Sequence, residues 1–197
     1  MQTLSPPRGS CSLSVKALSI TMGCMTLLIV AYPTLPEPDF CWIEAIRAVH
    51  DKLYEVIRAH VTLVFPDQAI SAEHLVDHAQ EIVQGVLQFQ VVFRCANVVK
   101  DMLSDQTHVF LIPDEGNAAL VKLHDRLYSG RLSQHRRLDV PYIPHITVAG
   151  SLDPLACKTL ADALNSQEFC LAGAVTEIDV VRYESGRADT IARLPLR

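Results

Sequence analysis

The sequence lacks a net positive charge, an excess of charged residues and glycine-rich segments. Each of these absences excludes a class of protein. Its 17 lysines and arginines stand against 22 aspartates and glutamates, giving a formal net charge of −5. It therefore has no global positive field to hold long nucleic acids, and any nucleic acid contact must be local. With 49% hydrophobic and 20% charged residues, the composition excludes a disordered or collagen-like chain. A globular chain of 197 residues can form one compact domain or two small lobes that share a core.

A disulfide framework is also missing. The six cysteines include no CxxC pair and follow no regular spacing; they are Cys11, Cys24, Cys41, Cys95, Cys157 and Cys170. Such scattered cysteines predict reduced thiols, which favours a cytoplasmic location.

Long apolar runs are absent apart from Ala17 to Ala31, which follows two basic residues and in this respect resembles a signal peptide. Two threonines and a glycine interrupt the run, which is also too short for a transmembrane span. From Thr26 onward it has the β-branched pattern of a strand that ends at a proline-rich turn. We therefore predict a first strand here, with Met25 as a natural start and residues 1–24 as a poorly ordered extension.

The chain from residue 25 to 197 alternates between strand and helix patterns, which predicts an α+β fold. Turn and cap residues together with hydrophobic periodicity predict helices over 40–53, 71–85, 118–128 and 154–164, and strands over 26–32, 61–65, 87–99, 108–112, 145–148, 169–181 and 190–194. The same order of elements occurs twice, so we expect a single domain with lobes at about 25–106 and 107–197.

Short motifs repeat along with the elements. A His-Asp-basic-Leu-Tyr sequence occurs at 50–54 and at 124–128, where each copy is predicted to end a helix. The sequences His60-Val-Thr-Leu and His145-Ile-Thr-Val also match, and the second half carries an insertion at about 130–141. Duplicated halves usually pack about a pseudo-twofold axis, which would bring the two equivalent strands together at one central cleft.

Each repeated strand carries a polar pair on one face. Residues two apart in a strand point the same way, so His60 and Thr62 face the predicted cleft, as do His145 and Thr147. One such histidine would most simply be structural. Two matching ones in repeated positions instead indicate a catalytic pair.

Two facing imidazoles suit the attack of water on a cyclic phosphodiester. One neutral histidine removes a proton from water, and one protonated histidine supplies a proton to the leaving ribose oxygen, without a metal or cofactor. The hydroxyls of Thr62 and Thr147 can donate hydrogen bonds to the non-bridging oxygens as negative charge builds. The rate should follow a bell in pH with limbs near the ordinary histidine pKa of about 6.5. The sequence leaves open which histidine is the base.

The two motifs, in the contexts His60-Val-Thr-Leu-Val-Phe-Pro and Pro144-His-Ile-Thr-Val, resemble the 2H phosphoesterase superfamily, in particular its 2'-5' RNA ligase and cyclic phosphodiesterase branch. The resemblance covers the chain from about Met25 to Leu196. It implies a bilobal fold in which two pseudo-symmetric halves have antiparallel sheets that flank a central cleft. It also implies catalytic roles for His60, Thr62, His145 and Thr147, and substrates that are small nucleotides or RNA ends with a 2',3'-cyclic phosphate or a 2'-5' linkage. Residues 1–24 depart from the family pattern.

Further candidates lie near the motifs. The insertion carries Arg131, Arg136 and Arg137, which could hold phosphates or an RNA end at the rim of the cleft, or form a solvated loop. Arg58 and Tyr142 lie just before the motif histidines and could line the cleft or brace it.

A metal site is not expected. His74 and His78 have the i, i+4 spacing of zinc ligands, but the acidic residues between and after them make a solvated polar helix face the better interpretation.

Two functions of different classes remain open. The first is a phosphoesterase, hydrolysing and in reverse forming bonds at a ribose 2' oxygen. The second is a nucleotide- or RNA-end-binding module with the same fold and little turnover. In both cases we expect a monomer that contacts neither long nucleic acids nor membranes. A third possibility is an acid-base enzyme that acts on another phosphate-like substrate, because the motifs indicate phosphate chemistry and not the base or ring attached to it. The sequence therefore does not select the physiological substrate.

Overall fold

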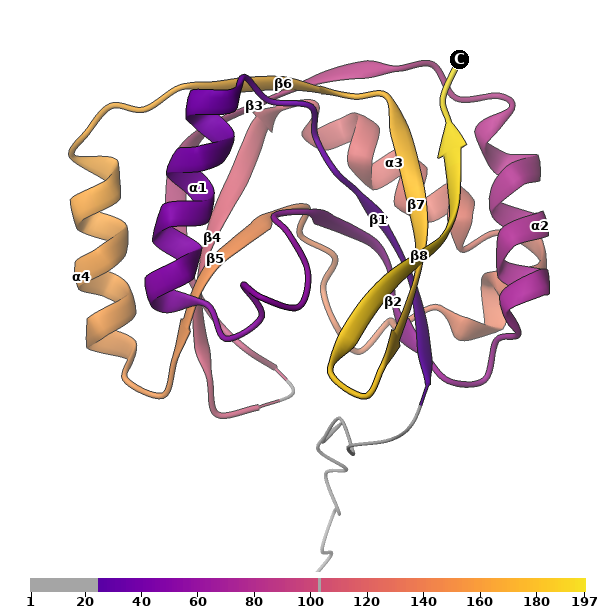
Figure 1. Cartoon of the computed structure of the whole chain (residues 1–197), viewed down its shortest axis with the longest axis horizontal. Coiled ribbons are helices and arrows are strands. Elements are labelled where there is room, and N and C mark those ends of the chain that lie inside the picture. The colour runs from indigo at the N-terminus through magenta and orange to yellow at the C-terminus, as the bar shows by residue number, and fades with distance from the viewer. Residues whose placement is uncertain (1–24, 103) are drawn as a thin grey trace, which may run out of the picture.

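The computed structural model describes residues 25–102 and 104–197, so the predicted extension over 1–24 lies outside the described part. The elements in chain order are β1 (Thr26–Ala31), α1 (Glu37–His50), β2 (Val61–Asp67), α2 (Ala72–Val83), β3 (Phe89–Lys100), β4 (Thr107–Glu115), α3 (Asn117–Leu127), the 3-10 helix η1 (Gly130–His135), β5 (Ile146–Ser151), α4 (Pro154–Asn165), β6 (Leu171–Val175), β7 (Glu177–Glu184) and β8 (Arg187–Pro195). Figure 1 shows their arrangement.

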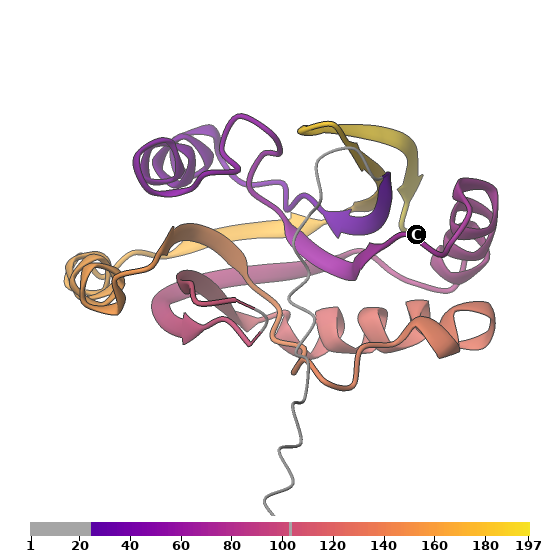
Figure 2. The ribbon, with the colours of Figure 1, turned by 90° about the horizontal axis from the view of Figure 1, so that it is seen from below.

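The strands form one curled antiparallel sheet in the order β6-β3-β4-β5-β2-β1-β7-β8 (Figure 2). Its two four-stranded halves meet between β5 and β2, where Val61 and Ile146 form the single registered pair. The prediction of an α+β fold built from two antiparallel halves is therefore confirmed, with the two expected sheets joined at one point.

The strand order is symmetric about this junction. β1 lies beside β2 as β4 lies beside β5, and Val30 pairs with Thr62 as Phe110 pairs with Thr147. Beyond them, β3 pairs with β4 and β7 pairs with β1. The half with β4 and β5 thus takes β3 from the first half of the sequence, and the half with β1 and β2 takes β7 and β8 from the second.

The helices cover one face of the sheet and bury its apolar side chains. Helices α1 and α4 pack on the half that contains β3, β4 and β5, while α2 and α3 pack on the other half (Figure 1). Val61, Leu63, Ile146 and Val148 are completely buried in this core. Because side chains alternate along a strand, Thr62 and Thr147 must point to the opposite, inner face.

Two of the predicted helices begin as expected, α2 after the cap residue Ser71 and α4 at Pro154. The Ser71 hydroxyl accepts a hydrogen bond from the backbone N–H of His74 at 3.3 Å, and the Asp153 carboxylate accepts one from Leu155 at 2.9 Å. Such bonds satisfy N–H groups that lack a partner in the first turn of a helix.

The strand predicted over 169–181 is divided in the structure. Residues Leu171–Val175 form β6 against β3, and Glu177–Glu184 form β7 against β1, so the chain crosses between the halves of the sheet at Thr176. Strand propensity is high on both sides of Thr176, and only the tertiary pairing separates them.

The repeated His-Asp-basic-Leu-Tyr sequences do not occupy equivalent places. His50 is exposed at the end of α1, whereas His124 is buried inside α3. The prediction that both motifs end matching helices is wrong for the first copy, because the chain leaves α1 at Asp51 and forms turns instead.

Two further features of the described residues are their free cysteines and the apolarity of their helices. Cys41, Cys95, Cys157 and Cys170 are free cysteines there, whereas Cys11 and Cys24 lie outside this part. Within the same residues, no helix combines the length and apolarity that a membrane span requires.

Candidate active site

The junction between the halves of the sheet brings the two histidine motifs together. In the antiparallel register set by Val61 and Ile146, His60 lies across from Thr147 and Thr62 lies across from His145. The charge of His60 also acts on His145, which places the two imidazoles within electrostatic reach. The expectation that duplication places the two HxT strands side by side is met by this pairing.

Both imidazoles are held in the same way by the backbone that precedes them. Nδ1 of His60 lies 2.8 Å from the carbonyl oxygen of Arg58, and Nδ1 of His145 lies 2.6 Å from that of Ile143. A carbonyl can only accept, so Nδ1 carries the proton in each ring. Each neutral ring therefore keeps an unprotonated Nε2 that can accept a proton.

Burial lowers the pKa of both histidines to about 4. For His60 the hydrogen bond to Arg58 opposes this shift, while the charge of Arg47 adds to it and that of Asp51 counteracts it. For His145 the bond to Ile143 opposes the shift, and repulsion from His60 and His108 adds to it. Both rings are therefore neutral at pH 7 in the free protein, which corrects the expected value near 6.5.

Aromatic rings surround the pair unequally. The ring of Phe110 stacks on His145 with centroids 3.5 Å apart and planes 14° from parallel, and His108 stacks on the same phenylalanine at 5.7 Å. His60 instead meets Tyr32 edge-on, with centroids 6.2 Å apart. The His145 ring is thus fixed by a face contact, whereas the His60 ring depends more on its hydrogen bond.

Arg58 lies beside the site. Its guanidinium carbon is 3.9 Å from the centroid of the Tyr32 ring, and its side chain is exposed. Burial raises the pKa of Tyr32, while the nearby Arg58 charge opposes that increase. The contact holds the guanidinium over Tyr32, the same ring that meets His60 edge-on.

Tyr142 braces strand β2 through its hydroxyl, which donates a hydrogen bond to the carbonyl of Thr62 at 3.0 Å. Its ring stacks on that of His124, whose Nδ1 donates to the carbonyl of Leu63 at 2.8 Å. Burial raises the pKa of Tyr142 far above its usual range, so it remains a donor. The Tyr142 hydroxyl therefore holds the backbone of Thr62 in place.

The arginines of the insertion all have acidic partners. Arg131 pairs with Glu81 of α2 at 2.9 Å, and Arg136 pairs with Asp125 of α3. Arg137 donates to both carboxylate oxygens of Asp139, at 2.8 and 2.6 Å. Arg131 and Arg136 thus attach the segment to α2 and α3. His135 attaches it to Asp67 at the end of β2, the opposite end from His60.

His74 and His78 are separated by burial. His74 is exposed, whereas His78 is buried and its Nε2 bonds to the carbonyl oxygen of Leu127 at 2.8 Å. The predicted solvated helix face is therefore wrong for His78, because α3 packs over that side of α2. No group of three or more metal-ligating side chains occurs in the part of the chain that the structure describes.

Sequence reasoning misses the side chains that support the four motif residues. Phe110, Tyr32 and His124 contact the motif residues or their strands, and the hydroxyl of Tyr128 accepts a hydrogen bond from the backbone N–H of Phe65 at 3.0 Å. The second His-Asp-basic-Leu-Tyr sequence supplies two of these residues, so a signal is present in the sequence but predicts only a helix end.

Comparisons with known proteins agree on one family. The family model described as "2'-5' RNA ligase superfamily" matches residues 35–187. No curated protein sequence matches the chain.

Solved structures share the fold at low sequence identity. The protein TT0787 of Thermus thermophilus is 16% identical, with a TM-score of 0.57 over 87% of this chain and 98% of the other. E. coli LigT complexed with 3'-AMP is 18% identical, with a TM-score of 0.55 over 87% and 98%. E. coli LigT complexed with NADP+ is 22% identical, with a TM-score of 0.51 over the same shares.

Proposed function

The chain belongs to the 2'-5' RNA ligase superfamily, and from this premise we propose that it is a metal-independent phosphoesterase acting on 2',3'-cyclic phosphates or 2'-5' phosphodiester bonds. Membership confirms the resemblance to the 2H phosphoesterases that the two motifs indicated. The family contains phosphoesterase and RNA ligase-like enzymes, and the narrower reaction rests on the site of this chain.

The observation that supports the proposal is the matched pair of imidazoles. His60 and His145 lie directly before the adjacent strands β2 and β5, and each has its Nδ1 proton held by the carbonyl two residues before it. Each ring therefore offers its Nε2 for proton transfer, and the pair can supply one base and one acid on opposite sides of a phosphorus atom.

The proposed hydrolysis uses both proton transfers. The neutral imidazole takes a proton from water as the water oxygen forms a bond to phosphorus. The bond from phosphorus to one ribose oxygen breaks, and the protonated imidazole gives that oxygen its proton. Thr62 and Thr147 donate hydrogen bonds to the non-bridging oxygens, which carry more negative charge in the transition state than in the substrate.

The same site can form a bond as well as break one. If the hydroxyl of a second nucleotide replaces water as the nucleophile, its oxygen bonds to phosphorus and the cyclic phosphate opens as before. One phosphate ester bond replaces another, so no nucleotide triphosphate is consumed. Ligation and hydrolysis then differ only in which nucleophile occupies the site.

A small nucleotide or an RNA end is the proposed ligand. Relatives of similar fold were crystallised with 3'-AMP and with NADP+, and the net charge of −5 disfavours long nucleic acids. Arg58, whose guanidinium lies over Tyr32, and Tyr142 are the proposed substrate-side neighbours of the pair, with Arg131, Arg136 and Arg137 reaching a longer RNA end.

Incubation with a panel of 2',3'-cyclic nucleotides and 2'-5' linked oligomers in excess EDTA tests the function. We expect turnover to survive chelation because two imidazoles supply both proton transfers, and the position of the phosphate in the product identifies the oxygen that leaves. A metal-dependent phosphodiesterase treated in parallel shows that chelation is complete. Loss of turnover that zinc or magnesium restores would contradict the mechanism, and binding without any turnover would favour the alternative of a binding module.

Neutralising the insertion tests the proposed contact with an RNA end. The triple variant Arg131→Gln, Arg136→Gln and Arg137→Gln should weaken binding of an RNA oligomer more than of a mononucleotide, and should flatten its salt dependence. Arg187→Gln, at a side chain that is 81% exposed, is the matched control for lost surface charge. Affinities for both ligands, measured by titration at several salt concentrations, test this prediction. Equal effects on both ligands would favour the alternative that the segment is a solvated loop.

A further inference from the structure

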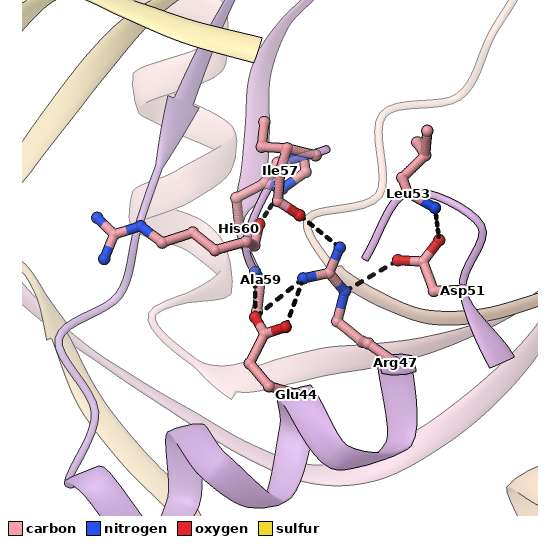
Figure 3. Close-up of polar contacts among 8 residues, drawn as sticks. Glu44, Arg47, Asp51, Leu53, Ile57, Ala59 and His60 are labelled. Carbon is pink, nitrogen blue, oxygen red and sulfur yellow. Dashed lines mark hydrogen bonds and ion pairs between the residues drawn. The ribbon is translucent and has the colours of Figure 1, made fainter. Parts of the chain in front are cut away.

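A buried ion cluster lies directly behind His60. Arg47 of α1 is only 1% exposed, although its side chain is charged. Its Nε donates to Asp51 at 2.9 Å, its Nη1 donates to both oxygens of Glu44 at 2.9 and 3.0 Å, and its Nη2 donates to the carbonyl of Ile57 at 2.6 Å. Figure 3 shows these contacts converging on the segment that enters β2. Burying a charge is costly unless it is paired and hydrogen-bonded, and these contacts meet that condition for Arg47.

The cluster forms hydrogen bonds with the backbone on both sides of Arg58. Arg47 holds the carbonyl of Ile57, while Glu44 accepts a hydrogen bond from the backbone N–H of Ala59 at 2.6 Å (Figure 3). Between these two anchors lies Arg58, whose carbonyl accepts the Nδ1 proton of His60 at 2.8 Å. Fixing residues 57 and 59 therefore fixes the carbonyl that sets the tautomer and orientation of the His60 ring.

The second histidine is supported by different means. The carbonyl that holds His145 belongs to Ile143, which lies between Tyr142 and the buried Pro144. Proline restricts its own backbone and that of the residue before it, and the Tyr142 hydroxyl is anchored on Thr62. The segment from Asp51 to Ala59 contains no proline. The ion cluster thus fixes the position of His60, whereas proline and ring stacking fix the position of His145.

We propose that Glu44 and Arg47 are positioning residues for His60: together they clamp the backbone around Arg58 so that its carbonyl holds His60 as the Nδ1-protonated tautomer, with Nε2 available for proton transfer. Neither residue touches the reacting atoms. The inference rests on the proposed function for its effect on rate, but its structural part concerns only the ring of His60.

The cluster predicts separate effects of its members. Glu44→Ala removes the acceptor for Ala59 and should lower kcat about 10- to 100-fold with little change in KM, since misplacing a reacting group by about 1 Å costs on that order. Glu44→Gln keeps an oxygen for the same N–H and should recover most of the loss. Arg47→Lys keeps the charge but cannot reach Glu44, Asp51 and Ile57 together, so it should resemble Glu44→Ala.

Nitrogen-15 NMR of the imidazoles gives a readout that does not depend on turnover. In the wild type, His60 and His145 should both give the spectrum of a single Nδ1-protonated tautomer. In Glu44→Ala and Arg47→Lys the His60 signals should shift toward a mixture of tautomers, while those of His145 stay unchanged. Ile43→Val, a cavity variant at a completely buried position of the same helix, is the control for a general loss of stability.

The possible outcomes are distinguishable. Unchanged His60 signals in a folded Glu44→Ala, or an equal change at His145 or in Ile43→Val, would overturn the positioning role. If Arg47→Lys does not fold, the pair Glu44→Ala and Glu44→Gln decides. Absence of turnover in the wild type would contradict the proposed function and leave the tautomer test intact.

Discussion

Replacing either His60 or His145 by alanine should lower kcat by roughly 100- to 10,000-fold, the usual contribution of one positioned proton-transfer group. The reason is structural: each ring is held with its Nδ1 proton on a backbone carbonyl, so the other nitrogen is reserved for the substrate. Substrate affinity should fall far less, because Thr62, Thr147 and Arg58 remain. Initial rates over a range of substrate concentrations separate the two effects.

The double variant adds a second criterion. Because the two rings act on one transition state, losing both should be little worse than the worse single loss, rather than the product of the two. His74→Ala, at an exposed position on α2, is the matched histidine control and should keep full activity. A single variant that retained more than about a tenth of wild-type turnover would refute the two-histidine mechanism.

Acidity should raise kcat/KM strongly. The reaction needs one neutral and one protonated ring, but burial lowers the pKa of both to about 4, so the free protein at pH 7 has nearly all of both rings neutral. Each unit by which the pH falls toward 4 should raise the singly protonated fraction about tenfold. Between pH 8 and 5 the expected gain in kcat/KM is therefore on the order of a thousandfold. Rate profiles at constant ionic strength measure it.

The profile of kcat should lie at higher pH than that of kcat/KM. A bound phosphate places negative charge beside the rings and favours the imidazolium, which raises its pKa in the complex. Two coupled rings titrate as a pair, so the limbs belong to the pair. A kcat/KM that stays flat from pH 5 to 8 would contradict the site described above.

Stability must be followed in the same experiment. A histidine whose pKa is lowered by folding binds fewer protons in the folded state than in the unfolded state between the two pKa values. The free energy of unfolding should consequently fall as the pH drops from about 6.5 toward 4. Circular dichroism at each pH shows whether the protein is still folded and confines the rate analysis to that range.

The sequence is most informative where chemistry and periodicity coincide. His60 and Thr62 alternate with buried Val61 and Leu63, so the face they share could be inferred from the strand period alone. The repeat of this pattern at His145 then predicts that two distant strands meet. Helix starts such as Ser71 could be predicted for a similar reason, because a cap is a local signal.

Supporting side chains could not be predicted in this way. Arg47 lies one turn after the buried Ile43 on α1, but a charged side chain at that position predicts exposure. Its burial becomes evident only when the segment to Ala59 folds back over the helix. Phe110 reads as a core residue of β4, and its stacking on His145 depends on the pairing of β4 with β5. The lowered pKa of both histidines follows from this tertiary burial, which no local pattern encodes.

The exchange of β3 for β7 and β8 between the two halves of the sheet constrains the order in which a nascent chain can fold. Strands β3 and β4 are neighbours in sequence and pair as an antiparallel hairpin, which can form as soon as both strands have left the ribosome. Strand β1 is synthesised first, yet one of its two neighbours in the sheet is β7 near the other end of the chain. The apolar edge of β1, including the fully buried Ile29 and Val30, stays open until translation is nearly complete. His60, which is synthesised before His145, therefore lies in the half of the sheet that is completed last.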